Sequence, residues 1–284
     1  MTDNGDDFEG AFGEDADEDA DVSDFEEAFE AGARKGSGGD EQISDDGASE
    51  RILDLSDRID LGIEGLDEMI RGGVPKGKTL CVIGGPGAGK TTFGMQFVAQ
   101  GLRNGENCVY FTLEQDEEDI ISTGDAKGWD FSEHDDSLAV VQMHPIEVAS
   151  SLRSIRNELP RMISSFGASR VVFDSITLVE MMFQDRADGR NQIFRFLEEL
   201  SDAGATTLVT SEADDEDPYS SRYGIVEYLS DAVFVLQYIR EDSSSETRLA
   251  LEITKIRDTS HSREVKPYEL TDEGIVVYSG ATIF

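Results

Sequence analysis

The chain has 284 residues, with 61 acidic and 24 basic side chains, so its net charge is −37. Hydrophobic residues make up 38%, which is enough for a packed core and excludes a chain that is disordered throughout. No run of about 18 apolar residues occurs, and the first thirty residues are acidic, so we expect neither a membrane span nor a secretory signal.

The negative charge is spread unevenly. Residues 1–50 contain 19 acids and two bases, which gives −17, and the other 234 residues carry −20. Repulsion within such a core is screened at molar salt, where the Debye length is about 3 Å. We therefore interpret the acidity as that of a cytoplasmic protein from a halophilic cell; the alternative is that acidity serves one specific activity.

We expect residues 1–52 to form a disordered acidic tail, because they contain few aliphatic side chains. Within the tail, the sequence DFEGAF at 7–12 recurs as DFEEAF at 24–29, and each copy places two phenylalanines four residues apart. This repeat is either a doubled docking motif for a protein partner or part of a solubilising tail.

Residues 53–284 predict one globular domain, in which apolar runs alternate with amphipathic stretches. In chain order we expect strands at 79–83, 107–113, 138–142, 170–174 and 205–210, and helices at 91–103, 117–127, 145–166 and 190–203. Further strands are expected at 231–239, 248–255 and 275–278. This order predicts an α/β fold with a mainly parallel central sheet and C-terminal antiparallel strands.

Cysteine and histidine usage gives little sign of metal or redox chemistry. Cys81 and Cys108 each lie inside an apolar run and are interpreted as buried free thiols rather than a redox pair. His134, His144 and His261 have no second metal ligand at close spacing, so a zinc site is not expected.

The strongest motif is GGPGAGKT at 84–91, which fits the phosphate-loop pattern G-x-x-x-x-G-K-[ST] between a predicted strand and a predicted helix. Glycines let backbone N–H groups converge on phosphate oxygens, and the helix adds the positive end of its dipole. We expect Lys90 to reach the β and γ phosphates and Thr91 to be a ligand of Mg²⁺. The expected ATP-binding residues are Gly85, Pro86, Gly87, Ala88, Gly89, Lys90, Thr91 and Thr92.

Two acids follow predicted strands and complete this site. Asp174 ends the apolar run VVFD and lies 84 residues after Lys90, so it is expected to hold Mg²⁺ together with Thr91. Glu114 ends the strand that follows the phosphate loop, and its carboxylate is expected to orient or deprotonate the attacking water. The alternative for Glu114 is a solvated start of the acidic run 114–119.

A basic cluster, KIRDTSH at 255–261, stands out in a chain with only seven lysines. Strand alternation places Lys255 and Arg257 on one side, and His261 follows after a turn. The cluster is either an ordinary salt-bridging strand or a group that reaches a phosphate, within the chain or across a subunit interface.

Taken together, GIEGLD at 62–67, GGVPKG at 72–77, the phosphate loop, Glu114, Asp174 and K-x-R-x-x-x-H resemble KaiC-type members of the RecA superfamily over about residues 55–280. The resemblance implies a RecA-like P-loop ATPase that binds ATP and Mg²⁺ and assembles head to tail, commonly as a hexamer. It also implies that Glu114 is the catalytic glutamate and that Lys255, Arg257 and His261 reach the neighbouring subunit's γ-phosphate.

The sequence departs from the family pattern at three places. One such domain is present instead of two in tandem, Gln115 replaces the second glutamate of the catalytic pair, and Glu227-Tyr228 replaces the autophosphorylated residues. Autokinase activity is therefore not expected, and Gln115 leaves one carboxylate for a slow hydrolysis.

Three functions follow from these observations. We expect a regulatory or signal-transduction ATPase that acts as a nucleotide-dependent oligomer. An alternative is a RadA-like recombinase paralogue that binds single-stranded DNA, although the segments 181–189 and 213–222, expected as loops, are poor in bases, so nucleic acid is an unfavoured partner. The other alternative is a nucleotide-gated scaffold of a motility motor with little hydrolysis.

Overall fold

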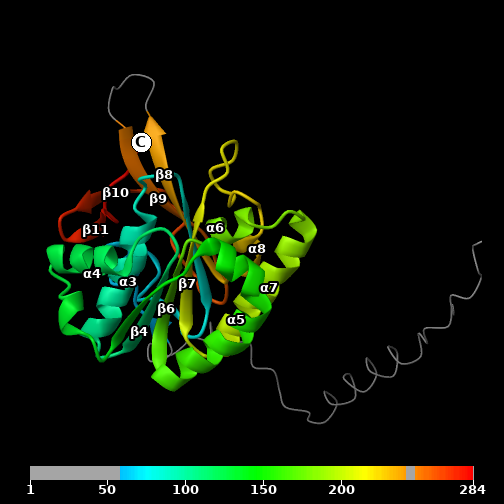
Figure 1. Cartoon of the computed structure of the whole chain (residues 1–284). Coiled ribbons are helices and arrows are strands. Elements are labelled where there is room, and N and C mark those ends of the chain that lie inside the picture. The colour runs from blue at the N-terminus through cyan, green and yellow to red at the C-terminus, as the bar shows by residue number, and fades with distance from the viewer. Residues whose placement is uncertain (1–57, 241–246, 284) are drawn as a thin grey trace, which may run out of the picture. The chain divides into compact units, whose positions relative to one another are not determined.

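The computed structural model describes residues 58–240 and 247–283, and the strands of these residues form one nine-stranded sheet beside a two-stranded one (Figure 1). The order in the large sheet is β11-β10-β9-β8-β3-β7-β6-β4-β5. The strands from β8 to β5 run parallel, whereas β8, β9, β10 and β11 pair antiparallel. A mainly parallel sheet with C-terminal antiparallel strands is therefore confirmed.

The strands are β1 (Arg58–Ile59), β2 (Val74–Pro75), β3 (Thr79–Gly84), β4 (Asn107–Thr112), β5 (Leu138–Gln142), β6 (Ala168–Asp174), β7 (Thr206–Glu212), β8 (Ala232–Arg240), β9 (Thr247–Ile256), β10 (Lys266–Thr271) and β11 (Gly274–Val277). The helices are α2 (Leu66–Met69), α3 (Lys90–Arg103), α4 (Glu117–Ala126), the 3₁₀ turn η2 (Phe131–Glu133), α5 (Pro145–Phe166), α6 (Ile176–Met181), α7 (Arg186–Asp202) and α8 (Val226–Leu229). All six residues of β3 are buried, as expected for a central parallel strand whose sequence is a continuous apolar run.

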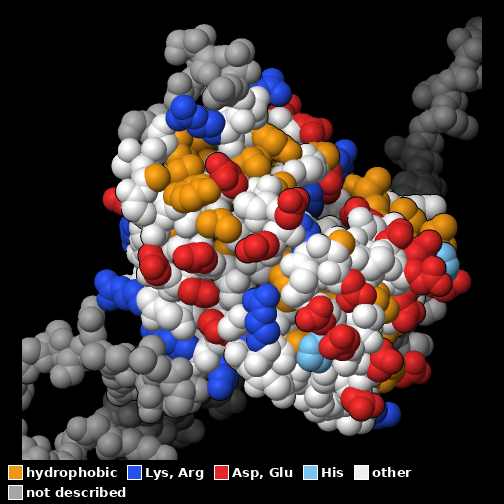
Figure 2. All heavy atoms as spheres, turned by 90° about the vertical axis from the view of Figure 1, so that its left-hand side faces the viewer, with side chains coloured by type: hydrophobic (Ala, Val, Ile, Leu, Met, Phe, Trp, Pro, Cys, Tyr) orange, Lys and Arg blue, Asp and Glu red, His pale blue; other side chains and the backbone are white. Residues whose placement is uncertain are grey.

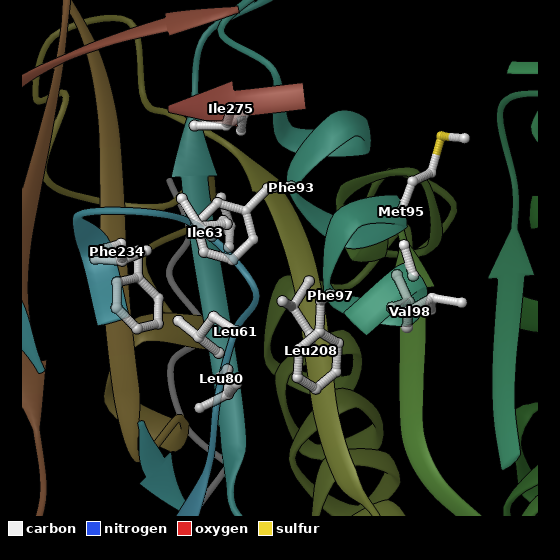
Figure 3. Packing of buried hydrophobic residues seen from close by; sticks show 14 of the residues in the cluster. Leu61, Ile63, Leu80, Phe93, Met95, Phe97, Val98, Leu208, Phe234 and Ile275 are labelled. Carbon is white, nitrogen blue, oxygen red and sulfur yellow. The ribbon is translucent and has the colours of Figure 1, made fainter. Parts of the chain in front are cut away.

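Helices cover both faces of the sheet, and each face has its own core. On one face α3 contributes Phe93 and Phe97, which pack with Leu80 and Phe234 of the strands in what we call the α3 cluster (Figure 3). On the other face α5, α6 and α7 pack against strand residues such as Phe173 in the α5 cluster. Figure 1 shows α3 and α4 on one side of the strands and α5, α6 and α7 on the other.

The antiparallel part of the sheet contains a β-bulge. Val233 of β8 pairs with Lys255 of β9, but the next residue, Phe234, pairs with Ile253, so Thr254 has no partner in the ladder. Ile253 and Ile256 both belong to the α3 cluster, although they are three residues apart.

Several predicted boundaries needed correction. Strand β10 was missed because its sequence, KPYELT, contains Pro267 and lacks an apolar run. Helix α6 was missed because six apolar-rich residues directly after a strand show no helical period. The predicted loop at 181–189 is wrong in its second half, since α7 begins at Arg186, and the Asp185 side chain caps it by accepting from the backbone N–H groups of Ala187 and Asp188.

The predicted tail, 1–52, with its phenylalanine repeat, lies outside the described residues. In the part of the chain that is described, no helix is both long and apolar enough to cross a bilayer. Acidic side chains are scattered over the face that carries α4 and β11, with fewer basic ones between them (Figure 2).

Candidate functional site

The phosphate-loop sequence forms the turn between the central strand β3 and helix α3, at the carboxyl edge of the parallel strands. Gly87 and Gly89 have positive φ angles of 76° and 95°, which side chains rarely adopt. At Gly89 an added Cβ would also lie 2.6 Å from Leu270 Cδ2 of β10. The turn therefore needs glycine at these positions, and it presents the N-terminus of a 14-residue helix to an anion.

Lys90, the first residue of α3, folds back over this turn. Its Nζ donates to the carbonyl oxygens of Gly84 at 2.8 Å and Gly85 at 3.2 Å, and it lies 3.5 Å from Glu212 Oε1 at the end of β7. The side chain of Lys90 is only 10% exposed. A cation is thus held at the mouth of the loop, where the β and γ phosphates of a nucleotide would lie.

Asp174 ends β6 and is buried, with hydroxyl groups on both carboxylate oxygens. Its Oδ2 accepts hydrogen bonds from Thr91 Oγ1 at 2.8 Å and from the Tyr110 hydroxyl at 2.8 Å, and its Oδ1 accepts from Thr210 Oγ1. Burial, together with the Asp174 carboxylate beside it, raises the pKa of Tyr110 well above its ordinary value. The Tyr110 hydroxyl therefore stays protonated and acts as a donor.

Glu114 follows β4, the strand beside β6, and lies at the same edge of the sheet as Asp174. Ser175 Oγ donates to Glu114 Oε1 at 2.8 Å, and the Leu113 N–H donates to the Asp174 carbonyl oxygen at 2.8 Å. The Glu114 residue is exposed, so water has access to its carboxylate. This position is suited to a group that orients or deprotonates water.

The donor set of this edge fits Mg²⁺. Thr91 and Asp174 offer a hydroxyl and carboxylate oxygens within one hydrogen bond of each other, and Mg²⁺ prefers oxygen ligands and keeps several waters. Residues 58–240 and 247–283 contain no group of three His, Cys, Asp or Glu side chains that could hold a metal ion on its own. A metal held here would therefore take its remaining ligands from water and nucleotide phosphates.

These groups share one open cleft of about 350 Å³. Its lining residues are Pro86, Gly87, Gly89, Lys90, Thr91, Thr92, Glu114, Asp174, Glu212 and Leu270. Of the residues predicted to contact the nucleotide, Ala88 is buried beneath the loop, and its carbonyl oxygen accepts from the Tyr268 hydroxyl.

Four residues of this region were missed by sequence reasoning: Tyr110, Ser175, Glu212 and Leu270. Glu212 ends an apolar strand just as Asp174 does, and that signal was available in the sequence. The hydrogen bonds of Tyr110 and Ser175 depend on contacts between strands and have no sequence signal.

The basic cluster lies away from this cleft. Arg257 NH1 lies 3.3 Å from Asp231 Oδ1, and the Asp231 backbone N–H donates to the carbonyl oxygen of Thr79, the first residue of β3. The phosphate loop follows the other end of β3, about 17 Å away for a strand of this length. Lys255 and Arg257 therefore cannot reach the phosphates on their own chain, and the within-chain alternative is wrong.

Lys255 and Arg257 are held by the end of α8. Lys255 Nζ donates to the carbonyl oxygens of Glu227 at 3.1 Å and Tyr228 at 3.3 Å, and Arg257 NH2 donates to the Tyr228 carbonyl at 3.4 Å. Partial burial and the nearby Arg257 guanidinium lower the pKa of Lys255. Both cations thus point toward α8, on the face of the sheet that carries the α5 cluster and at its amino edge.

His261 lies in the segment that follows β9. The N–H of its neighbour Ser262 donates to the carbonyl of Met69, the last residue of α2, and the buried His261 Nδ1 has no hydrogen-bond partner among the described residues. The expected role of His261 at the neighbouring subunit's γ-phosphate therefore stays a prediction.

The family model described as "ATPase: KaiC" matches residues 59–282 of this chain. The chain belongs to the KaiC family of ATPases. It is 33% identical over 225 residues to the circadian clock oscillator proteins KaiC of Acaryochloris marina and of Synechococcus elongatus, covering 76% of this chain and 43% of each relative. The chain thus spans less than half the length of these KaiC relatives.

The fold is also shared with a KaiC-like protein from the hyperthermophilic archaeon Pyrococcus horikoshii. That crystal structure has a TM-score of 0.69 and 33% sequence identity, and the match covers 78% of this chain and 98% of the other. The RecA-like KaiC fold expected from the sequence is therefore confirmed.

Proposed function

We propose that this KaiC-family chain is a slowly hydrolysing regulatory ATPase that works as a head-to-tail oligomer, a hexamer in its full form, with ATP and Mg²⁺ at each interface. The observation that carries the proposal is the placement of two sets of charged side chains. Lys90, Glu114 and Asp174 lie at the carboxyl edge of the sheet, whereas Lys255 and Arg257 lie at the amino edge. Head-to-tail contact brings the two edges of neighbouring subunits together.

Each side chain then has a defined task. Lys90 offsets charge on the β and γ phosphates, and Thr91 with Asp174 would hold Mg²⁺, which shields the phosphates when bound. Glu114 accepts the proton of the attacking water or orients that water. The neighbour's Lys255 and Arg257 stabilise the negative charge that develops on the γ-phosphate. With Gln115 in place of a second carboxylate, we expect slow turnover.

The recombinase alternative has little support from the described surface. The segment after β7 exposes Asp215, Glu216 and Asp217, and three neighbouring carboxylates repel a phosphate backbone. The scaffold alternative differs from our proposal only in its hydrolysis. It is therefore decided by measurement of turnover.

The first experiment measures ATP turnover at molar KCl for wild type, Lys90→Ala and Glu114→Gln. We expect turnover in the wild type alone, because each substitution removes a group needed for phosphate binding or for water activation. Wild-type turnover equal to that of Lys90→Ala would exclude the enzyme and favour the scaffold. Stoichiometric binding of single-stranded DNA at the same salt would favour the recombinase.

The second experiment tests the interface. Arg257→Ala should keep ATP binding and lose hydrolysis, and a 1:1 mixture with Glu114→Gln should restore activity at about one quarter of the sites in a head-to-tail ring. The control is Arg103→Ala, which removes an exposed arginine at the end of α3 and should leave turnover unchanged. Light scattering that shows a monomer with ATP and Mg²⁺ at all concentrations would exclude the oligomer.

We also propose that the acidity reflects adaptation to a salt-rich cytoplasm, and that residues 1–52 bind a protein partner. If the acidity is such an adaptation, the midpoint temperature of thermal unfolding should rise as KCl increases from roughly 0.1 to 3 M. Over this range the Debye length falls from about 10 Å to below 3 Å, so repulsion between the carboxylates is screened. Deletion of residues 1–52 should remove the partner from a pull-down without loss of ATP binding. An unchanged set of partners would contradict the tail's role.

A further inference from the structure

A continuous set of contacts connects Lys90 at the phosphate loop with Lys255 at the opposite edge. It begins at the Lys90 ammonium, whose three donors reach the carbonyl oxygens of Gly84 and Gly85 and, at 3.5 Å, Glu212 Oε1. An ammonium has three N–H bonds, so a γ-phosphate bound by Lys90 competes with Glu212 for the same cation. The Glu212 side chain is 27% exposed, and its charge is therefore only partly screened by water.

The other oxygen of Glu212 faces the segment that follows β7. Glu212 Oε2 lies 3.6 Å from Arg222 NH1, and the Arg222 backbone N–H donates to the Glu212 carbonyl oxygen at 2.8 Å. Ala213 and Ser221 form an antiparallel bridge directly beside this contact. Glu212 thus lies between two cations, one at the phosphate loop and one at the end of the 213–222 segment.

Ser221 continues the path toward α8. Its Oγ donates to Glu227 Oε2 and accepts from the Ile225 N–H at 3.2 Å, and the residue is buried. The Glu227 carbonyl oxygen in turn accepts from Lys255 Nζ at 3.1 Å. Lys90, Glu212, Arg222 with Ser221, Glu227 and Lys255 therefore form one series of direct contacts, which we call the Lys90–Lys255 path.

We propose that Glu212 is a positioning residue that couples the nucleotide on its own phosphate loop to the placement of Lys255 through this path. The inference rests on the proposed interface role of Lys255 and Arg257. When Lys90 donates to a γ-phosphate, the Glu212 carboxylate loses one of its two cations and pairs with Arg222 alone. That change shifts Ser221 and the one-turn helix α8, whose carbonyl oxygens hold Lys255 and Arg257. Each subunit would thus report its own nucleotide to its neighbour's site.

The structure of α8 favours such a response. It has four residues, and its packing into the α5 cluster depends on Val226 with only partial burial of Leu229. A single turn has little cooperative stability of its own, so a small change at Glu227 can move it. The bistable element is the Lys90 ammonium, which has either Glu212 or a phosphate as its anionic partner.

Amide hydrogen exchange tests this coupling in the full-length protein. The probe is a non-hydrolysable ATP analogue with an imido bridge before its γ-phosphate, added with Mg²⁺ at molar KCl. In the wild type we expect exchange at 226–230 to change by about five-fold or more, the size of a typical coupling between sites. In Glu212→Gln the change should be lost, because a neutral amide pairs weakly with either cation, and calorimetry sets the analogue concentration that saturates the variant.

A matched control and a second variant keep the test decisive. Asp215→Asn makes the same chemical change at an exposed residue off the path and should keep the response. Arg222→Gln breaks the path without touching Lys90 and should lose the response even if Glu212→Gln binds the analogue poorly. A response that persists in both path variants, or that is missing from the wild type, overturns the proposal. The subunit-mixing experiment decides the interface role separately, because its readout does not involve Glu212.

Discussion

The hydroxyl of Tyr110 donates a 2.8 Å hydrogen bond to Asp174 Oδ2, the same oxygen that accepts from Thr91. One carboxylate oxygen therefore receives a donor from the strand β4 and another from the first turn of α3. The first donor comes from a fully buried side chain that does not itself line the nucleotide cleft.

Tyr110→Phe should lower the free energy of unfolding by about 1.5–3 kcal/mol, the range for a hydrogen bond to a charged group. It should also raise the Mg²⁺ concentration needed for half-maximal binding of ADP, because the Asp174 carboxylate is held by one donor fewer. Urea unfolding and a Mg²⁺ titration measure the two effects. Tyr268→Phe removes a buried hydroxyl that donates to Ala88 instead and should change stability alone. Equal Mg²⁺ dependence in wild type and Tyr110→Phe would show that the hydroxyl has no part in holding the metal.

Arg170→Met should destabilise the fold by about 1–3 kcal/mol, because it removes several hydrogen bonds to charged groups while the Asp60 and Glu106 carboxylates stay partly exposed to water. The Arg170 side chain is fully buried and contacts Asp60 Oδ1 at 2.8 Å and Glu106 Oε2 at 2.7 Å. Because the Asp60 and Glu106 side chains are 37% and 23% exposed, salt screens these pairs in part, and the loss should be smaller at roughly 3 M KCl than at roughly 1 M. Arg103→Met, at an exposed arginine, serves as the control in the same unfolding assay. A loss below that of the control would contradict the prediction.

We expect the stability of the fold to depend on pH because of the buried side chain of Glu180. Burial, and to a smaller extent the charge of Glu227, raises the pKa of Glu180 from 4.5 to about 8, and neither carboxyl oxygen has a hydrogen-bond partner in the described structure. At pH values between these two pKa values, the Glu180 carboxyl is protonated in the folded state and ionised in the unfolded state. The free energy of unfolding therefore falls as the pH rises.

Glu180→Gln removes this dependence. We expect the variant to gain stability relative to wild type as the pH rises from about 5 to 8, by up to roughly 1.4 kcal/mol per pH unit. Chemical denaturation at several pH values measures the difference, and Glu133→Gln at an exposed site is the control. A difference that stays constant over this pH range would mean that Glu180 is ionised throughout.

Gly65→Ala should destabilise the chain more than Gly105→Ala. Both residues have positive φ angles, 79° and 73°, so both substitutions strain the backbone. An added Cβ at Gly65 would lie 1.8 Å from the Val277 carbonyl oxygen, whereas nothing lies within 4 Å at Gly105. The difference in unfolding free energy should reach about 1–3 kcal/mol, the range for overpacking. Equal losses would show that β11 moves away at little cost.

The sequence was sufficient for the parts of the fold that depend on local patterns. The apolar run of β3 followed by glycines, and the acid at the end of β6, predicted both the sheet and the carboxyl-edge cleft. Strand β10 and helix α6 lack a periodic pattern and become visible only when their neighbours are in place. The catalytic and interface roles of Glu114, Lys255 and Arg257 stay predictions until turnover and assembly are measured.

Contacts between distant segments were beyond the reach of sequence patterns. The Tyr110–Asp174 hydrogen bond joins residues 64 positions apart. The Gly77 N–H donates to Thr206 Oγ1, 129 positions away along the chain. The Ser262 N–H after β9 donates to the Met69 carbonyl oxygen at the end of α2, and spacing along the chain does not indicate that contact.

The bulge at Thr254 determines which face of the sheet carries the two cations. In a regular strand, residues with odd numbers share a face, and Lys255 would then lie beside Leu251 and Ile253 in the α3 cluster. The extra residue reverses this parity, so Ile256 takes the core position and Lys255 and Arg257 turn toward α8. If the strand kept Thr254 but lost the bulge, the regular alternation would place both cations on the opposite face, beside Leu251 and Ile253. The side of the sheet on which Lys255 and Arg257 lie thus depends on a single unpaired residue, Thr254.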